Sequence, residues 1–132
     1  MADIEATAKN DEKFFATSRV GDFELSIDAT GEDGPSPDEI VVADYAACYS
    51  FAFRAGADRE HDLSLGAIRT EAEASLTDDD FLESVSLTVH VEDDLDDEQV
   101  DALIELGEEL CHVHQAVKEE LHADINVVPN SS

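Results

Sequence analysis

The chain has 132 residues, the length of one domain with a single hydrophobic core. Asp and Glu number 34 against seven Lys and Arg, which gives a formal net charge of -27 and a sequence pI of about 4.1. This charge argues against nucleic acid and anionic membranes as partners, because there is no basic patch to bind phosphates.

The acidic residues are spread along the whole chain, as on a solvated surface adapted to concentrated salt. At about 1 M salt the Debye length is about 3 Å, so repulsion between such charges is screened. No signal peptide is visible at the start, and no apolar run is long enough to span a bilayer. These features predict a cytoplasmic protein of a salt-accumulating microbe.

The first 35 residues are predicted to form strands and tight turns. A short apolar run begins at Phe14, and residues 23–29 alternate apolar and polar side chains, as a half-exposed strand does. Gly21 is predicted to lie in the hairpin turn, which places Arg19 near a strand end. Residues 30–35 have the composition of a loop.

Residues 36–54 predict a long buried helix that carries Cys48 and ends near Gly56. Ser36 can cap its N-terminus, and Glu39 stands where a capping box returns a hydrogen bond. Apolar residues cover nearly every side of this helix, unlike a surface helix with one polar face. The helix is therefore expected to run through the core or an interface.

The rest of the chain alternates strand and helix patterns. Residues 63–76 predict a strand with a bulge near Gly66, and residues 85–91 predict a second strand antiparallel to it. A helix is expected from Asp96 to Leu121, followed by a last strand at 123–128 and a tail at 129–132. The chain is thus predicted to be a single α+β domain, 1–132.

Cys48 and Cys111 are both expected on inward helix faces, 111 - 48 = 63 positions apart. They meet only if the two helices pack together. One thiol could then react with an oxidant and the other could resolve the sulfenic acid as a disulfide. The alternative is two buried cysteines that only fill space. A metal site is not expected, since Cys111 and His114 are the only pair on one face.

Three short segments resemble the OsmC/Ohr family of thiol-dependent hydroperoxide reductases: Pro37-Asp38-Glu39, Tyr45-Ala46-Ala47-Cys48 and Leu110-Cys111-His112-Val113. In element order the resemblance extends from about Arg19 to Val128. It implies an OsmC-like α+β fold and an intertwined homodimer with its sites at the subunit interface. It also implies reduction of organic hydroperoxides with electrons from a thiol reductant and without a bound cofactor.

The resemblance implies roles for particular residues. Cys48 corresponds to the peroxidatic cysteine and Cys111 to the resolving cysteine. Arg19 is the candidate for the family's arginine. The acid that holds this arginine corresponds to Asp38 in the hydroperoxide reductases and to Glu39 in the broader OsmC-like branch, so both stay open.

A cation is also needed on physical grounds. Burial disfavours a Cys48 thiolate, and Asp44 one turn earlier would oppose it further. Phe51 is expected to line the substrate pocket. Tyr45 is expected in the core or an interface, with a place in that pocket, one turn from Cys48, as the alternative. His112 and His114 stand where the family has a Pro-Val-Ser run, which predicts an altered wall around the resolving cysteine.

The predicted function is thus that of an enzyme, a two-cysteine hydroperoxide reductase. The alternative is a non-catalytic domain of the same fold that binds a small apolar ligand at the dimer interface with inert thiols. A thiol and imidazole metal-binding domain is a third and weaker hypothesis.

Overall fold

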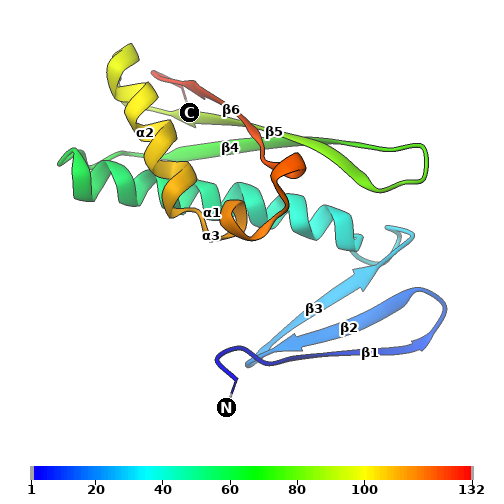
Figure 1. Ribbon diagram of the computed structural model, residues 1–132. Helices are drawn as coiled ribbons and strands as arrows, with labels where there is room; N and C mark the ends of the chain where they lie inside the picture. Colours follow the sequence, from blue (N-terminus) through cyan, green and yellow to red (C-terminus); the bar gives the residue numbers. More distant parts are fainter. Residues whose placement is uncertain (1, 132) are drawn as a thin grey trace. The chain divides into compact units, whose positions relative to one another are not determined.

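In the computed structural model, which describes residues 2–131, the chain divides into two units, one ending at Val41 and one beginning at Val42. The first unit contains a three-stranded antiparallel sheet in the order β1-β2-β3 (Figure 1). Its strands are β1 (Ala6–Glu12), β2 (Phe15–Val20) and β3 (Phe23–Asp28). The predicted hairpin turn is confirmed, with Gly21 at φ 59° between the paired residues Val20 and Phe23.

Strand β1 was not predicted. Its side chains are small or polar and all exposed, so no apolar alternation marks it. It forms by pairing with β2, from Ala6 opposite Val20 to Glu12 opposite Phe15. Phe23 and Leu25 of β3 are 76% and 45% exposed, so large apolar side chains of this sheet remain uncovered in the single chain.

Helix α1 (Pro37–Glu60) begins with the predicted capping box. The Glu39 N–H donates to Ser36 Oγ at 3.2 Å, and the Ser36 N–H donates to Glu39 Oε1 at 2.9 Å. The predicted end near Gly56 is wrong, because the helix continues to Glu60. Gly56 is instead a packing position, where an added Cβ would lie 3.0 Å from the Cβ of Leu106.

The second unit contains the sheet β4-β5-β6, with β4 (Ile68–Leu76), β5 (Leu82–Val91) and β6 (Asp124–Val128). Strands β4 and β5 are antiparallel, as predicted, while β6 pairs with β5 in parallel. The predicted bulge at Gly66 is wrong. Residues 63–67 precede β4, and the register irregularity lies between Ser75 and Leu76.

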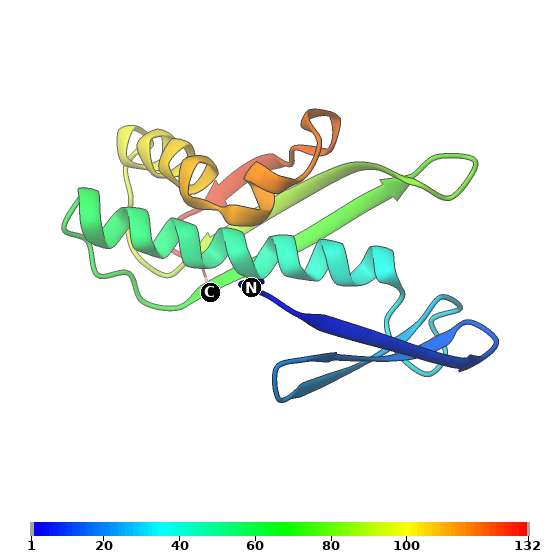
Figure 2. The same ribbon diagram turned by 60° about the horizontal axis from the view of Figure 1, so that its bottom comes forward.

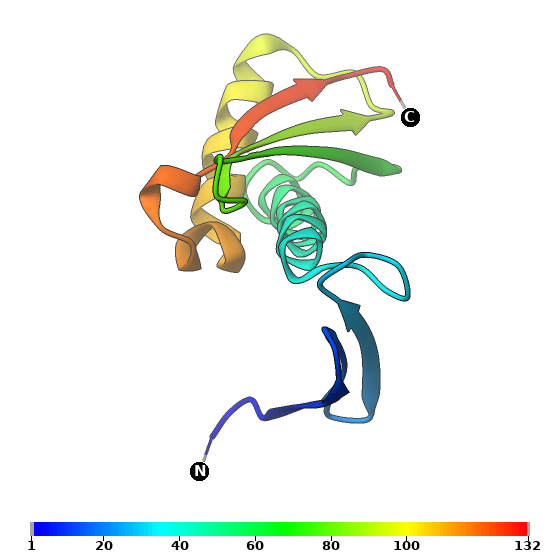
Figure 3. The same cartoon turned by 90° about the vertical axis from the view of Figure 1, so that its right-hand side faces the viewer.

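Helices α1 and α2 (Asp97–Leu110) lie on one face of this sheet (Figures 1 and 3). Alternate residues of β5 point into the core between the sheet and these helices: Val85, Leu87, Val89 and Val91. Helix α1 contributes one buried face to this core, while Phe51 on another face is 72% exposed. In the single chain, helix α1 is therefore not buried on nearly every side, as its apolar residues had predicted.

The predicted helix from Asp96 to Leu121 is interrupted. Asp96 caps α2 as part of a capping box, but α2 ends at Leu110. Cys111 then has an extended backbone, with φ -76° and ψ 111°, before the short helix α3 (His112–Ala116) and the 3-10 turn η1 (Glu119–Leu121) (Figure 2). The apolar spacing continues through the break, which is why the sequence did not reveal it.

The residues after β6 are attached to the sheet. The Ser131 N–H donates to the Val91 carbonyl at 2.8 Å, and the Asn130 N–H donates to the Asp93 carbonyl at 2.9 Å. Of the predicted tail, Ser132 lies outside the described residues. The α+β fold is confirmed, and no helix between residues 2 and 131 has the length and apolar character needed to cross a membrane.

Candidate functional site

The structure brings Cys48 and Cys111 together within the second unit. Cys48 lies on α1 and is half-buried, whereas Cys111 is fully buried at the break between α2 and α3. Both are free thiols, and they lie close enough for Cys48 to act on the pKa of Cys111. One accessible thiol thus lies beside one buried thiol.

The two thiols have different surroundings. Burial, together with the nearby Cys48 thiol, raises the pKa of the Cys111 thiol to about 11, against the opposing hydrogen bond from the His114 N–H. Cys111 is therefore protonated near neutral pH. Asp44, predicted to oppose a charge on Cys48, is exposed to solvent, which screens its effect.

Cys48 opens onto a surface hollow of about 320 Å³. The hollow is lined by Cys48, Phe51, Ala52, Ala55, Arg59, Leu110 and His112. Phe51 lines this hollow together with Cys48, and its role in a substrate pocket stays a prediction. His112, one of the two histidines predicted to alter the wall, also contributes to it.

Arg59 was missed in the sequence. It lies 59 - 48 = 11 positions after Cys48, which is close to three helical turns and so places both on one side of α1. This spacing in the sequence could have identified Arg59 as a neighbour of Cys48. Arg59 is exposed and has no hydrogen bond or ion pair with any of the residues that the structure describes. It is therefore a free cation at the hollow.

Tyr45 does not line the hollow at Cys48. It is 0% exposed, and its hydroxyl accepts a hydrogen bond from the Ala123 N–H at 2.9 Å and pairs with His114 Nδ1 at 2.7 Å. The sequence position one turn from Cys48 suggested a pocket residue. Its actual place in the core depends on a partner 69 positions away, which no local pattern reveals.

A buried imidazole lies next to the Cys111 segment. His114 is 6% exposed, and its ring is stacked on that of His122 with centroids 4.0 Å apart. Burial lowers the pKa of His114, and the neighbouring His122 lowers it further. His114 is thus held neutral near pH 7.

The remaining candidates belong to the first unit. Arg19 Nη2 lies 2.5 Å from Glu24 Oε1 on the neighbouring strand. Glu39 is used in the capping box, and Asp38 is half-buried at the start of α1. The pairing of Arg19 with Asp38 or Glu39 stays a prediction.

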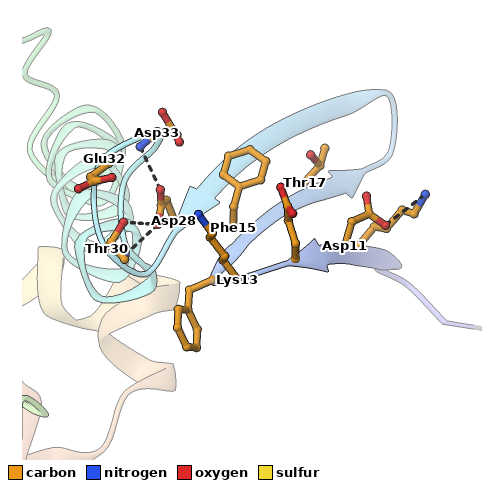
Figure 4. A pocket seen from close by; sticks show the side chains of 11 residues that line it. Asp11, Lys13, Phe15, Thr17, Asp28, Thr30, Glu32 and Asp33 are labelled. Carbon is orange, nitrogen blue, oxygen red and sulfur yellow. Dashed lines mark hydrogen bonds and ion pairs between the residues drawn. The ribbon is translucent and has the colours of Figure 1, made fainter.

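A second hollow of about 610 Å³ belongs to the first unit (Figure 4). Asp28 is its buried carboxylate, and it accepts hydrogen bonds from the Thr30 hydroxyl, the Thr30 N–H and the Asp33 N–H. These bonds, first of all that of the Thr30 hydroxyl, lower the pKa of Asp28. Its oxygens are thus occupied in shaping the loop after β3. Among residues 2–131, no group of three or more His, Cys, Asp or Glu side chains is arranged to hold a metal ion.

Comparison with known proteins identifies the family of the chain. The family model described as OsmC-like protein matches residues 29–126. The chain belongs to the OsmC-like family. The match includes both cysteines of the site.

An uncharacterized protein of Haloferax volcanii is 45% identical to this OsmC-like protein over 128 residues, 97% of each chain. An OsmC-like protein of Mycoplasma pneumoniae shares the fold, with a TM-score of 0.80 at 17% identity over 97% of this chain and 96% of that one. The organic hydroperoxide resistance protein OsmC of Legionella pneumophila gives a TM-score of 0.75 at 23% identity, over 96% and 97%. The family as a whole supports a redox or peroxide-resistance role.

Proposed function

We propose that this OsmC-like protein reduces organic hydroperoxides by a cycle of the Cys48 and Cys111 thiols. The observation that carries the proposal is that the two thiols are neighbours in the second unit. One sulfur is half-buried at a hollow, and the other is fully buried and protonated. Two cysteines that only filled space would need neither this contact nor this difference in exposure.

In the first step the Cys48 thiolate attacks an oxygen of the hydroperoxide. An S–O bond to the terminal oxygen forms and the O–O bond breaks, so the sulfur is oxidised to a sulfenic acid. The leaving alkoxide takes a proton from water and is released as an alcohol. Cys48 suits this step because it lines the hollow, where the apolar side chains of Phe51 and Leu110 can contact an organic group. Cys111 is too deeply buried to meet the peroxide first.

In the second step the Cys111 sulfur attacks the sulfenic sulfur of Cys48. The S–S bond forms, the S–O bond breaks, and the hydroxyl leaves with the thiol proton as water. An external dithiol then reduces the disulfide by thiol exchange and is itself oxidised to a disulfide. No bound cofactor is required for this cycle.

The proposal includes a cation for the Cys48 thiolate. The resemblance assigns this role to Arg19, oriented by Asp38 or Glu39. Arg59 is a second candidate, because it lines the same hollow as Cys48 and has no partner among the described residues. Either guanidinium would favour the charged form of the sulfur.

We further propose that the protein is a homodimer. The single chain exposes several large apolar side chains, including Phe14 at 71%, Phe23 at 76%, Phe51 at 72% and Phe81 at 71%. Exposure of this kind is typical of a surface that is covered in an assembly. The acidic composition supports the proposal that the dimer works in a salt-rich cytoplasm.

The test is a thiol count and intact mass in high salt, before and after one equivalent of an organic hydroperoxide. We expect loss of two thiols and an intramolecular disulfide in the parent protein. Cys48→Ser should keep its remaining thiol, while Cys111→Ser should accumulate oxidised Cys48. Survival of both thiols in excess peroxide would refute the proposal and favour a non-catalytic, ligand-binding domain.

A further inference from the structure

Cys111 has a dual place in the backbone, since it ends one helix and begins the next. Its N–H donates to the Gly107 carbonyl of α2 at 2.9 Å, and its own carbonyl accepts from the Gln115 N–H at 3.1 Å. Its Sγ caps α3 by accepting a hydrogen bond from the His114 N–H at 3.4 Å. The position of the sulfur is therefore tied to the position of α3.

Helix α3 has only five residues, too few to be stable by itself. Besides a hydrogen bond from the Gln115 side chain to the Glu108 carbonyl of α2 at 3.0 Å, α3 is attached to the unit by the ring of His114, which meets the Tyr45 hydroxyl of α1 at 2.7 Å. The same hydroxyl accepts from the Ala123 N–H, just before β6. Helix α1, helix α3 and the segment before β6 thus meet at one buried oxygen.

The environment strengthens this attachment. Tyr45 and His114 are buried, and hydrogen bonds between buried groups face little competition from water. His122 covers the other side of the His114 ring in a stacked arrangement, with 28° between the planes. The charged neighbour Glu108 of α2 also acts on His114, so α1, α2 and the segment after η1 all contact this ring or influence it.

From this geometry we propose that His114, held by the Tyr45 hydroxyl, is a positioning residue that keeps the Cys111 thiol against Cys48. The inference rests on the proposed function. Its consequence is kinetic, because the Cys48 sulfenic acid has two fates. Cys111 can resolve it with release of water, or a second hydroperoxide can oxidise it to sulfinic acid and leave as an alcohol. A Cys111 thiol held against Cys48 favours disulfide formation over oxidation to sulfinic acid.

The experiment uses the full-length protein with Tyr45→Phe and His114→Leu, which both remove the hydrogen bond. The matched control is Tyr49→Phe. Tyr49 is also fully buried on α1, but its hydroxyl donates to the Ile104 carbonyl at 3.1 Å. His114→Asn keeps a polar group near the position of Nδ1 and should restore part of the effect. Each protein is treated with excess organic hydroperoxide, and the sulfinic fraction of Cys48 is measured by mass.

One buried neutral hydrogen bond corresponds to about a three- to tenfold change in an equilibrium or rate. We therefore expect Tyr45→Phe and His114→Leu to slow disulfide closure by about that factor and to accumulate sulfinic acid. The first loss of the Cys48 thiol should not change. Equal sulfinic fractions in Tyr45→Phe and in the parent, or an equal rise in Tyr49→Phe, would overturn the proposal.

A second measurement separates this proposal from the proposed function. The proteins are equilibrated in glutathione redox buffers, and the Cys48–Cys111 disulfide is quantified without any peroxide. A disulfide weakened in Tyr45→Phe and His114→Leu, but not in Tyr49→Phe, supports positioning even if peroxide leaves the parent unreacted. Unchanged disulfide stability in both variants would refute positioning even if the peroxide cycle operates.

Discussion

The ring of Tyr49 lies directly against Gly107, so that α1 and α2 approach each other where α2 has no side chain. A Cβ built on Gly107 would lie 2.8 Å from both Cζ and the hydroxyl oxygen of Tyr49. The Tyr49 hydroxyl in turn donates to the Ile104 carbonyl at 3.1 Å. The ring of Tyr49 thus occupies the space that a side chain at position 107 would need, one turn before Cys111.

Gly107→Ala is therefore expected to destabilise the protein. Overpacking of a buried contact costs about 1–3 kcal/mol, and the better helix propensity of Ala offsets only about 1 kcal/mol of it. Denaturant unfolding in high salt measures the difference. Glu109→Ala, at an exposed position of α2, is the control and should be nearly neutral. A Gly107→Ala protein more stable than the parent would show that the ring of Tyr49 moves aside at little cost.

The raised pKa of Cys111 predicts slow alkylation of this thiol. In Cys48→Ser the burial that mainly raises the pKa of Cys111 remains. A free thiol has a pKa of about 8.5, so its alkylation rate levels off above that pH. The rate of Cys111 with iodoacetamide should instead still rise steeply between about pH 8.5 and 9.5. The urea-unfolded protein, as control, should approach its plateau in that range. A plateau at pH 8.5 in the folded variant would contradict the burial of Cys111.

The lowered pKa of His114 predicts a loss of stability on acidification. An unfolded histidine has a pKa of about 6.5, and burial holds the folded value below this. Between the two values the unfolded state binds more protons, so the free energy of unfolding falls as the pH falls through 6.5. The difference between the parent and His114→Asn, measured from about pH 7.5 to 5.5, isolates this contribution. A difference that does not vary with pH would contradict it.

Arg59→Gln is expected to slow the reaction of Cys48 with peroxide, because it removes the free cation of the hollow. An exposed charge interaction is worth up to about 1 kcal/mol, so the rate should fall by up to about fivefold, and less in high salt. Arg59→Lys should retain most of the rate. Lys118→Gln removes the same charge from an exposed position before η1 and serves as the control. Equal rates in Arg59→Gln and Lys118→Gln would leave Arg19 as the candidate cation.

Features encoded by neighbouring residues could be predicted from the sequence. The alternation of β5, the turn at Gly21 and the capping residue Ser36 are local, because each depends on side chains a few positions apart. The α+β fold followed from the order of such segments. Both cysteines were predicted on inward helix faces, whereas Cys111 lies at the break after α2.

Features that depend on distant partners could not be predicted. Gly56 reads as a helix stop, but the close approach of Leu106 makes it an interior packing position. The break at Cys111 preserves the apolar spacing of a continuous helix, so periodicity alone cannot detect it. Strand β1 is polar and becomes a strand only by pairing with β2.

The parallel pairing of β5 and β6 has a consequence for folding. The two strands are neighbours, yet 124 - 91 = 33 positions separate the end of one from the start of the other. Such non-local pairing forms late, since the crossover must be ordered first. Cys111 lies within that crossover. Its sulfur therefore stays unprotected until the crossover is ordered, so Cys111 is most open to oxidation during folding.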